Sequence, residues 1–443
     1  WTHGVSVQEF GGLCQWLVNV MNIVTGNFDR VGGAMFTKPA VDLMKFQGRG
    51  SYDRFRSSVR GLPEFGGELP AATMAEEMLA DRGGRIRGML TVAGNPVLST
   101  PNGRQLDRAL AGLDSMVSID FYVNETTRHA HVILPPTAAL EHDHYDVVFN
   151  LLAIRNVARY SAALFEPGLD TRHDWEIALE LSRRLQDGPL WRRLKATLAR
   201  WQMMSLGPTG LLKQALKRGP YAQTVDYPSL TAAEHGLDLG PLEPCLPERL
   251  ATRDQRINLA PEPMIRDLAR LRSRMEPGQT DISTGELLLI SRRQPRSNNS
   301  WMHNCERLVK GKNRCTLLIH PDDADRLGLA QSQNALLKSR VGETVAPIEI
   351  TEEIMPGVVC LPHGWGHDRE GVQLKVASQH PGTSINDLTD HESVDPLSGN
   401  AALSAVPVTV RPLHEPRPKR APGTTSESFG AKTSREHSLA ETR

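Results

Sequence analysis

Hydrophobic positions near the start of the chain recur at the spacing of a helix. They predict a helix over residues 7–25, and the apolar residues that share one of its faces are Phe10, Leu13, Leu17, Val20 and Val24. Gly26 and Asn27 follow this segment, and such a pair is typical of a helix C-terminus. Residues 45–70 are rich in Gly, Arg and Pro and predict an extended surface segment.

A rhythm of short apolar strands and helices begins near residue 86. Strands are predicted at 86–92, 116–119 and 132–134, with a helix at 104–112 and a short helix capped by Asn124 between them. This alternation is typical of a doubly wound, Rossmann-like parallel sheet of the α/β class. The loops after such strands share one edge, where ligands bind. We predict that this edge carries Gly94, Asn95, Pro96, Asp120 and residues 135–137.

The middle of the chain is predicted to be helical and then irregular. Residues 174–186 have the spacing of an amphipathic helix. Residues 190–218 mix Lys and Arg with Trp and Leu, which fits either a membrane-surface or partner-binding helix or an outer helix that packs on its own domain. We favour the outer helix. Residues 219–285 are Pro-rich and predict an irregular connector.

The pattern changes to many short strands after residue 286. Strands are predicted at 287–290, 316–319, 335–337, 344–350, 358–361 and 406–410. Between them lies one short helix, 322–327, for which Asp322 is the predicted cap. Short strands separated by Gly and Pro turns indicate a β-barrel. Residues 413–443 have few apolar side chains and predict a disordered tail.

These patterns divide the chain into four predicted parts. An α/β nucleotide-binding portion occupies residues 1–190, and the connector occupies residues 191–285. The barrel, which we expect to have six strands, occupies residues 286–412, and the tail occupies residues 413–443. The fold class is therefore an α/β parallel-sheet domain followed by a β-barrel.

Composition narrows the class of function. Lys plus Arg and Asp plus Glu both number 51 in 443 residues, whereas a nucleic-acid-binding protein usually carries a basic excess. No run of 18 apolar residues is present, so we expect no membrane span. The five cysteines are widely spaced, which suits a reducing, cytoplasmic compartment and does not match an iron–sulfur spacing. The chain opens on Trp1, and we expect it to be a fragment or a processed chain.

Histidine pairs are the most visible candidate metal ligands. His129 and His131 form one H-x-H pair, and His142 and His144 form another. Such a pair on a strand points both imidazoles to one face, as metal sites do. We nevertheless predict no metal ligand here, because a buried strand begins at His131 and because His129 suits the end of a helix.

The loop after the first barrel strand is a candidate for phosphate binding. Residues 292–301 contain three arginines and two asparagines beside turns, and Arg side chains bind phosphate by paired hydrogen bonds. Residues 363–367, His-Gly-Trp-Gly-His, have glycines that would allow close backbone approach to a ligand. The chain lacks G-x-G-x-x-G and the Walker A motif, so a nicotinamide or P-loop site is not predicted.

Several stretches taken together resemble the molybdopterin-dependent oxidoreductases of the formate dehydrogenase and nitrate reductase type. Residues 130–141 (AHVILPPTAALE) are similar to the family signature, with His131 where an Asp is usual. Other similar stretches lie at residues 25–33, 94–96, 292–304, 321–324, 363–366 and 386–389. The resemblance spans residues 1–411, and the usual cysteine-rich segment and metal-ligating residue of the family are not among these residues.

The resemblance implies a bis(molybdopterin guanine dinucleotide) cofactor with Mo or W, and a [4Fe-4S] cluster in an upstream segment. One guanosine would lie at the sheet edge, with Asp120 accepting from its ribose or base. The residues that the resemblance and the loops assign to the cofactor are Gln8, Gly94, Asn95, Pro96, Asp120, Arg292, Arg293, Ser297, Asn298, His363, Gly364, Trp365 and Asn386. No catalytic residue and no metal ligand is assigned.

The function implied by the resemblance is part of a molybdenum-dependent two-electron oxidoreductase. It would act on a small-molecule substrate and pass electrons to an iron–sulfur or flavin protein. Two alternatives stay open: another reductase of the same family, acting on an oxyanion or sulfur compound, and a non-catalytic nucleotide-binding module.

Overall fold

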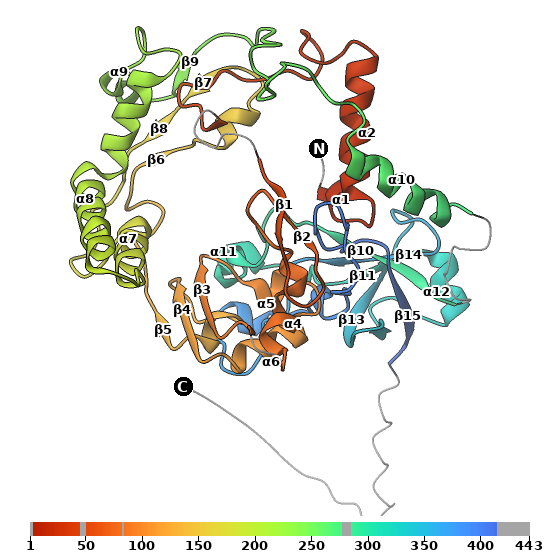
Figure 1. Ribbon diagram of the computed structural model, residues 1–443. Helices are drawn as coiled ribbons and strands as arrows, with labels where there is room; N and C mark the ends of the chain where they lie inside the picture. The colour runs from red at the N-terminus through yellow and green to blue at the C-terminus, as the bar shows by residue number, and fades with distance from the viewer. Residues whose placement is uncertain (1–2, 45–49, 82–83, 277–284, 414–443) are drawn as a thin grey trace, which may run out of the picture.

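The computed structural model describes residues 3–44, 50–81, 84–276 and 285–413. It places an α/β unit and a β-barrel in contact, and helices α2, α7, α8 and α9 with the short strands β6–β9, all within residues 11–24 and 144–238, form an open ring above them (Figure 1). The predicted tail, from residue 414 on, and parts of the predicted surface segment lie outside the described residues.

The first predicted helix is present but shorter. Helix α1 (His3–Ser6) precedes α2 (Gly11–Val24), which ends before Gly26 in the left-handed conformation. Leu13 is buried, whereas Leu17 and Val24 are exposed, so only part of the predicted apolar face is covered by described residues.

The parallel sheet is confirmed. It has the order β3-β4-β5, made of β3 (Gly88–Val92), β4 (Ser115–Ile119) and β5 (Val132–Ile133). Helices α4 (Met74–Leu79), α5 (Pro96–Ser99) and α6 (Gly103–Ala111) share a hydrophobic core with this sheet. Successive side chains of a strand point to opposite faces of the sheet. The side chains on the face away from these helices, among them Leu90, Val92 and Val132, are exposed. Within the described residues, helices therefore cover one face of the sheet rather than two.

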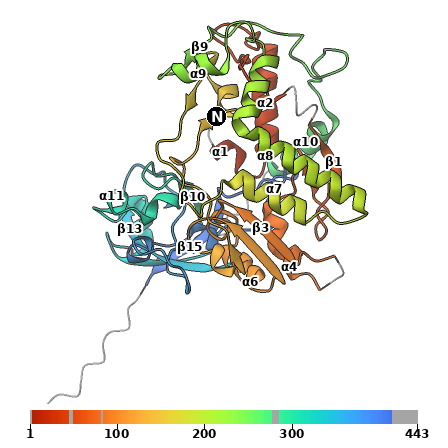
Figure 2. The same cartoon turned by 90° about the vertical axis from the view of Figure 1, so that its left-hand side faces the viewer.

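Three smaller strand pairs and a hairpin of helices complete the fold. Strand β1 (Tyr52–Arg56) pairs with β2 (Pro63–Phe65). The other pairs are β6 (His144–Tyr145) with β8 (Tyr160–Ser161), and β7 (Val157–Ala158) with β9 (Leu237–Asp238). Helices α7 (Asp174–Arg184) and α8 (Leu190–Arg218) lie side by side (Figure 2).

Helix α8 is broken in its middle, and its two halves differ in burial. Gly207 has φ 62° and ψ 176°, and Pro208 follows, so the backbone leaves the helical conformation there. Leu212 and Leu216, beyond the break, are buried, whereas Trp191, Leu194, Leu198 and Trp201, before it, are exposed. The prediction that this helix packs on its own domain is thus confirmed for its second half, after Pro208.

The predicted irregular connector contains regular structure. Helix α9 (Tyr227–Ala232) begins at the cap Asp226, and helix α10 (Glu262–Arg274) packs near α2. The prediction missed α10 because its many arginines and its preceding prolines hide the helical period. Short 3-10 helices lie at Ala71–Thr73, Thr127–His129, Phe149–Leu152, Trp301–Asn304, Ala377–Gln379 and Ile385–Asp387.

The barrel is confirmed as a closed, six-stranded structure with the order β10-β14-β11-β13-β12-β15. Its strands are β10 (Leu287–Arg292), β11 (Leu317–Ile319), β12 (Asn334–Lys338), β13 (Glu343–Ile350), β14 (Val358–Pro362) and β15 (Val406–Pro412). Two of the six neighbouring pairs are parallel, β10 with β14 and β11 with β13, and the other four are antiparallel. Inward-facing side chains such as Leu289, Leu317, Leu337 and Val408 are fully buried and form the largest core.

Two short helices accompany the barrel, α11 (Glu306–Val309) and α12 (Pro321–Leu327). The predicted cap of the second was wrong. Pro321 occupies the first helical position, so the cap is His320, whose Nδ1 accepts a hydrogen bond from the backbone N–H of Asp322 at 3.2 Å.

Candidate cofactor site

The predicted ligand edge of the sheet and the loops of the barrel meet. Asn386, in a barrel loop, donates from Nδ2 to the carbonyl of Leu98 at 2.7 Å. The backbone N–H of Gln373 donates to the carbonyl of Val123 at 2.9 Å. The two sets of candidate residues therefore adjoin, as a ligand shared between them requires.

The turn after β3 is held by its own side chains. Asn95 donates from Nδ2 to Glu125 at 2.7 Å, and its Oδ1 accepts from the hydroxyl of Thr126 at 2.7 Å. Pro96 begins α5, and Gly94 has room for a Cβ in the protein alone, with no atom nearer than 3.7 Å. The side chain of Asn95 is thus engaged inside the protein, and the backbone of the turn remains for a ligand.

Asp120 caps the turn after β4. Its Oδ1 accepts from the backbone N–H groups of Phe121 and Tyr122 at 2.7 and 3.1 Å, and its Oδ2 accepts from Asn124 at 3.2 Å. The carboxylate is partly exposed, so it keeps acceptor capacity toward solvent at the ligand edge.

The two adjacent arginines of the barrel loop have different surroundings. The Arg292 guanidinium donates to the carbonyls of Cys360, Arg314 and Thr316 and to the Thr316 hydroxyl, at 2.7–3.2 Å. Arg293 donates to the side chain of Asn299, and the structure gives it no carboxylate partner among the described residues. Arg292 is consequently occupied by the barrel, whereas Arg293 is the arginine that is free to meet an anion.

The loop beyond Arg293 has a strained, closely packed backbone. Asn298 and Asn299 have φ of 40° and 61°, two consecutive left-handed residues whose N–H groups can form an anion-binding concavity. Gly364 lies against this loop with φ 91°, and a Cβ there would be 2.1 Å from the carbonyl oxygen of Asn299. Glycine is therefore required at residue 364 for both conformation and space.

Ser297 begins a buried chain of hydrogen bonds. Its hydroxyl lies 2.8 Å from Nε2 of His303, whose Nδ1 lies 2.8 Å from Nε2 of His367. His367 Nδ1 lies 2.8 Å from Oε1 of Glu125, in the α/β unit. Burial, with the neighbouring His367, lowers the pKa of His303 to about 3, so that imidazole is neutral at pH 7.

His363 and Trp365 are buried beside this chain. The Trp365 ring stacks on His303 with centroids 3.9 Å apart, and its Nε1 has no hydrogen-bond partner although it is buried. Burial and the charge of Arg293 lower the pKa of His363 to about 4. An orphaned donor beside a cationic loop fits an anionic, hydrogen-bonding ligand.

Two predicted residues have structural partners. Asn386 is fully buried, and besides Leu98 it contacts Thr389, whose hydroxyl donates to its Oδ1 at 2.9 Å. Gln8 lies at the start of α2, where its Nε2 donates to Cys14 Sγ at 3.1 Å and its Oε1 accepts from the N–H of Phe10. The neighbouring N–H of Gly12 donates to Asp395 at 3.0 Å, so this end of α2 touches the barrel loops.

The histidine pairs lie apart from these loops. His131 accepts a hydrogen bond at Nδ1 from the N–H of Met116, and His129 pairs with Asp107 at 2.6 Å. His142 and His144 line a cavity of about 700 Å³ beside α7 and α8, together with His173 and Trp175. No group of three or more His, Cys, Asp or Glu side chains is arranged to hold a metal ion in the part of the chain that the structure describes.

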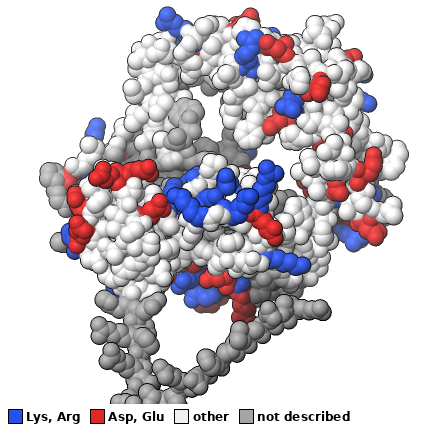
Figure 3. All heavy atoms as spheres, turned by 180° about the vertical axis from the view of Figure 1, so that it is seen from behind, with Lys and Arg blue, Asp and Glu red and all other residues white. Residues whose placement is uncertain are grey.

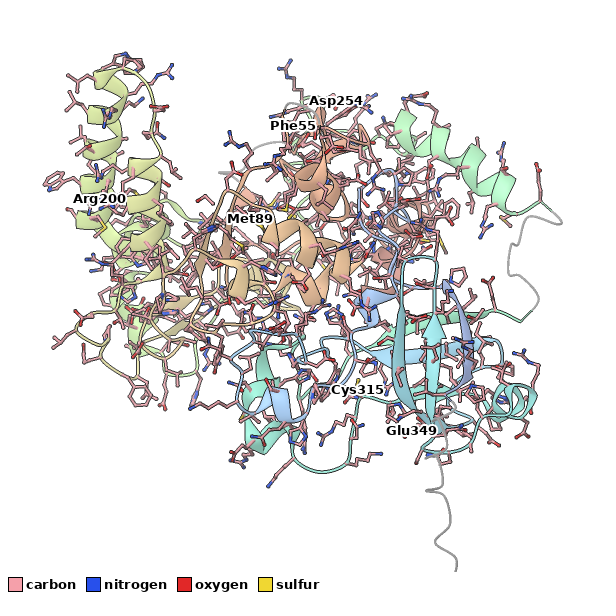
Figure 4. All side chains as sticks on the ribbon, turned by 90° about the horizontal axis from the view of Figure 1, so that it is seen from below. Phe55, Met89, Arg200, Asp254, Cys315 and Glu349 are labelled. Carbon is pink, nitrogen blue, oxygen red and sulfur yellow. The ribbon has the colours of Figure 1, made fainter. Side chains whose placement is uncertain are left out.

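Charged side chains gather on one face of the molecule. Figure 3 shows a band of Lys and Arg across the middle of the rear face, bordered by Asp and Glu. In Figure 4, Arg200 on α8 lies on the opposite side of the view from Cys315 and Glu349, which mark the barrel.

Two family models match the chain. The model described as molybdopterin oxidoreductase matches residues 1–184, and the model described as molydopterin dinucleotide binding domain matches residues 287–407. The chain belongs to the molybdopterin oxidoreductase family. The second match coincides with the closed barrel, so the loops around Arg293 and Gly364 belong to a dinucleotide-binding domain of that family.

The relatives and the fold agree with this membership. The chain is 25% identical over 312 residues, 70% of its length, to the F420-dependent formate dehydrogenase 1 subunit alpha of Methanococcus maripaludis. It is 33% identical over 124 residues, 27% of its length and 17% of the relative, to the assimilatory nitrate reductase catalytic subunit of Bacillus subtilis. Acetylene hydratase from Pelobacter acetylenicus shares the fold, with a TM-score of 0.59 at 17% identity over 79% of this chain and 47% of that one.

This molybdopterin oxidoreductase chain spans less than half of the formate dehydrogenase subunits that it matches, 43% and 40% of their lengths. None of the helices in the described ranges is long and apolar enough to cross a membrane.

Sequence reasoning missed three members of the site. His303 lies in the family-like stretch 292–304 but was assigned no role, Glu125 lies in no recognisable motif, and Arg369 was missed because its partner Asp107 is distant in sequence. Arg369 pairs with Asp107 of α6 at 3.2 Å and with Asp387 of the barrel loop at 2.7 Å. The available signal was His367, the second histidine of residues 363–367, because its imidazole contacts both His303 and Glu125.

Proposed function

We propose that this chain holds a bis(molybdopterin guanine dinucleotide) cofactor within a two-electron oxidoreductase of the formate dehydrogenase or nitrate reductase type. The observation that carries the proposal is that the barrel loops at residues 366–367 and 386 contact the α/β unit beside the carboxyl edge of its parallel sheet, and that the loop of residues 293–299 packs on Gly364 next to them. Both surfaces are ligand-binding positions in their fold classes.

The residues present fit such a cofactor. Phosphate oxygens would accept from Arg293 and from the N–H groups of the left-handed pair Asn298 and Asn299, and the orphaned Nε1 of Trp365 offers a further donor. The backbone turn at Gly94 and the carboxylate of Asp120 would bind a nucleotide at the sheet edge. The bound metal would supply the two-electron chemistry, while these residues bind and orient the cofactor.

The remaining predicted residues keep smaller roles in the proposal. Pro96, Asn95 and Asn386 would hold the turns in place, and Ser297 and His363 would line the loop that faces the cofactor. Gln8 would approach it from the start of α2. Arg292 would act on the cofactor through the loop that it braces.

The substrate, electron carrier and compartment also belong to the proposal. We infer a small-molecule substrate, and an iron–sulfur or flavin protein as electron partner. Two of the formate dehydrogenase relatives are named as alpha subunits, which supports a partner chain. A [4Fe-4S] cluster would lie in sequence that precedes these residues, and the five unpaired cysteines support a cytoplasmic location.

The test is the cofactor content of the purified protein. Oxidative release should yield a fluorescent pterin, acid hydrolysis should yield guanosine monophosphate, and elemental analysis should detect Mo or W. Guanine nucleotide without pterin would favour the nucleotide-binding module, and the absence of both would overturn the proposal. Turnover of formate, nitrate, and oxyanion or sulfur-compound substrates would separate the members of the family.

A further inference from the structure

One of the connections between the barrel and the α/β unit is a continuous chain of side-chain hydrogen bonds. It runs from Ser297 through His303 and His367 to Glu125, with each step 2.8 Å long. We call these four residues the clasp. Glu125 then continues to Asn95, in the turn after β3, at 2.7 Å. The clasp therefore begins in one predicted cofactor loop and ends at the other.

The clasp is sealed from solvent. His303 and His367 are each 1% exposed and Glu125 is fully buried. Trp365 covers one face of His303, and Gly364 packs on the loop that carries Ser297. A polar chain in such a place must satisfy its own donors and acceptors, because no water can replace a lost partner.

The charge of Glu125 sets the direction of the bond between Glu125 and His367 in the clasp. Burial raises the pKa of Glu125, but the hydrogen bonds from His367 and Asn95 outweigh it and hold that pKa below its ordinary value. The carboxylate accepts, so His367 carries a proton on Nδ1. One proton then lies between His367 Nε2 and His303 Nδ1, and the Ser297 hydroxyl completes the chain by donating to or accepting from His303.

We propose that His303, His367 and Glu125 are positioning residues that hold the cofactor loops of the barrel in register with the sheet edge. They act through Ser297, Trp365 and Asn95, which lie at those loops. The inference rests on the proposed function, because it gives these residues a task in cofactor binding. Simple space filling is the competing role, and it predicts that shape alone matters.

Glu125→Gln separates the two roles, since glutamine keeps the size of the side chain and removes its charge. We expect cofactor retention through gel filtration, read as released pterin per chain, to fall by about tenfold, the loss typical of one buried hydrogen bond to a charge. Glu64→Gln is the matched control. Glu64 is also a buried carboxylate, and it accepts hydrogen bonds from Ser51, Arg54 and Gly67 near its own hairpin.

A second measurement does not depend on the cofactor. In protein labelled with ¹⁵N-histidine, Glu125→Gln should change the protonation pattern of the His367 and His303 ring nitrogens, whereas Glu64→Gln should not. Ser297→Ala should alter His303 and leave His367 unchanged. Circular dichroism reports whether each variant folds. If Glu125→Gln does not fold, Ser297→Ala, which removes one oxygen atom, replaces it as the test variant.

The outcomes are distinct. Loss of pterin together with altered imidazole nitrogens in Glu125→Gln supports the clasp. Unchanged pterin content in Glu125→Gln, with pterin present in the wild-type protein, overturns it. Absence of pterin from the wild-type protein overturns the proposed function and, with it, the cofactor role of the clasp; the ¹⁵N spectra then report only whether the hydrogen-bonded chain exists.

Discussion

At the scale of single residues, neighbours in sequence differ sharply in role. Arg292 donates its hydrogen bonds to carbonyl groups of the barrel. Arg293, one position later, has no carboxylate partner among the described residues. Arg292 is the last residue of β10 and stays against the carbonyl groups of the barrel, whereas Arg293 begins the loop that follows the strand. Of these two adjacent arginines, Arg292 thus stabilises the barrel and Arg293 is the candidate anion-binding residue.

This division predicts opposite phenotypes for two alanine variants. Arg292→Ala should lower the free energy of unfolding by about 1–3 kcal/mol, because buried carbonyls lose their donor. Arg293→Ala should leave that free energy within about 0.5 kcal/mol of wild type, as surface changes usually do, and should lower the pterin content. Urea unfolding and pterin release measure the two effects, and equal destabilisation by both variants would contradict the assignment.

His303 predicts a pH dependence of stability. Its pKa is lowered to about 3 in the folded protein, below the ordinary value of about 6.5. The unfolded chain therefore binds a proton first as the pH falls. The stabilising contribution is complete above pH 6.5 and is lost between pH 6.5 and about 3. Urea unfolding at a series of pH values in this range gives the free energy of unfolding as a function of pH. This free energy should change less with pH in His303→Phe than in wild type, whereas the exposed variant His144→Gln should keep the wild-type pH dependence.

At the scale of elements, the contacts between loops carry the site. Gly364 packs directly on the backbone of Asn299, while Gly357, before β14, has a similar left-handed conformation with φ 82° and nothing within 4 Å of a Cβ. A Cβ at residue 364 would collide with the backbone of Asn299, whereas a Cβ at residue 357 would meet no atom. They form a matched pair for measuring the close approach of the loops.

Gly364→Ala should destabilise the protein more than Gly357→Ala. Each substitution has the cost of a left-handed backbone, about 1–3 kcal/mol, and only Gly364→Ala also forces the two loops apart. The difference between their unfolding free energies measures the loop contact. If the two variants lose equal stability, the loops are not held against each other in solution.

The elements themselves could be predicted from the sequence, and their mutual contacts could not. Strands β3 and β4 and helix α6 fall within two residues of prediction because apolar runs and turn residues are local signals. Arg369 pairs with Asp107, and His367 pairs with Glu125, and in each case the two residues are more than 200 positions apart along the chain. Long-range hydrogen bonds leave no period in the sequence, so the clasp and the roles of Arg292 and Asn386 were out of reach.

At the scale of the whole molecule, a few charges join the barrel to the α/β unit. Arg369 lies between Asp107 and Asp387, and its side chain is largely buried. Arg128 and His129 also pair with Asp107. Burial alone would raise the pKa of Asp107, but the hydrogen bonds and charges of these partners outweigh burial and lower that pKa to about 2. The junction is therefore polar and specific rather than a sliding apolar surface.

Removal of the central cation should uncouple the two units. Arg369→Ala should lower the stability by about 3 kcal/mol or more, because two partly buried carboxylates lose a partner, and should broaden or split the calorimetric transition. The control is Arg340→Ala, which removes an exposed pair with Asp390 within the barrel and should change the stability by less than about 1 kcal/mol. A single, unchanged transition in Arg369→Ala would show that other contacts couple the units.

Strand β15 gives the assembly a temporal order. It lies between β10, the first strand of the barrel, and β12, and it is the last of the six along the chain. During synthesis, both neighbours remain open edges until residues 406–412 have left the ribosome, and open edges pair with whatever strand is near. Insertion of a large prosthetic group must then wait until translation has passed this segment, and the nascent chain needs protection in the interval.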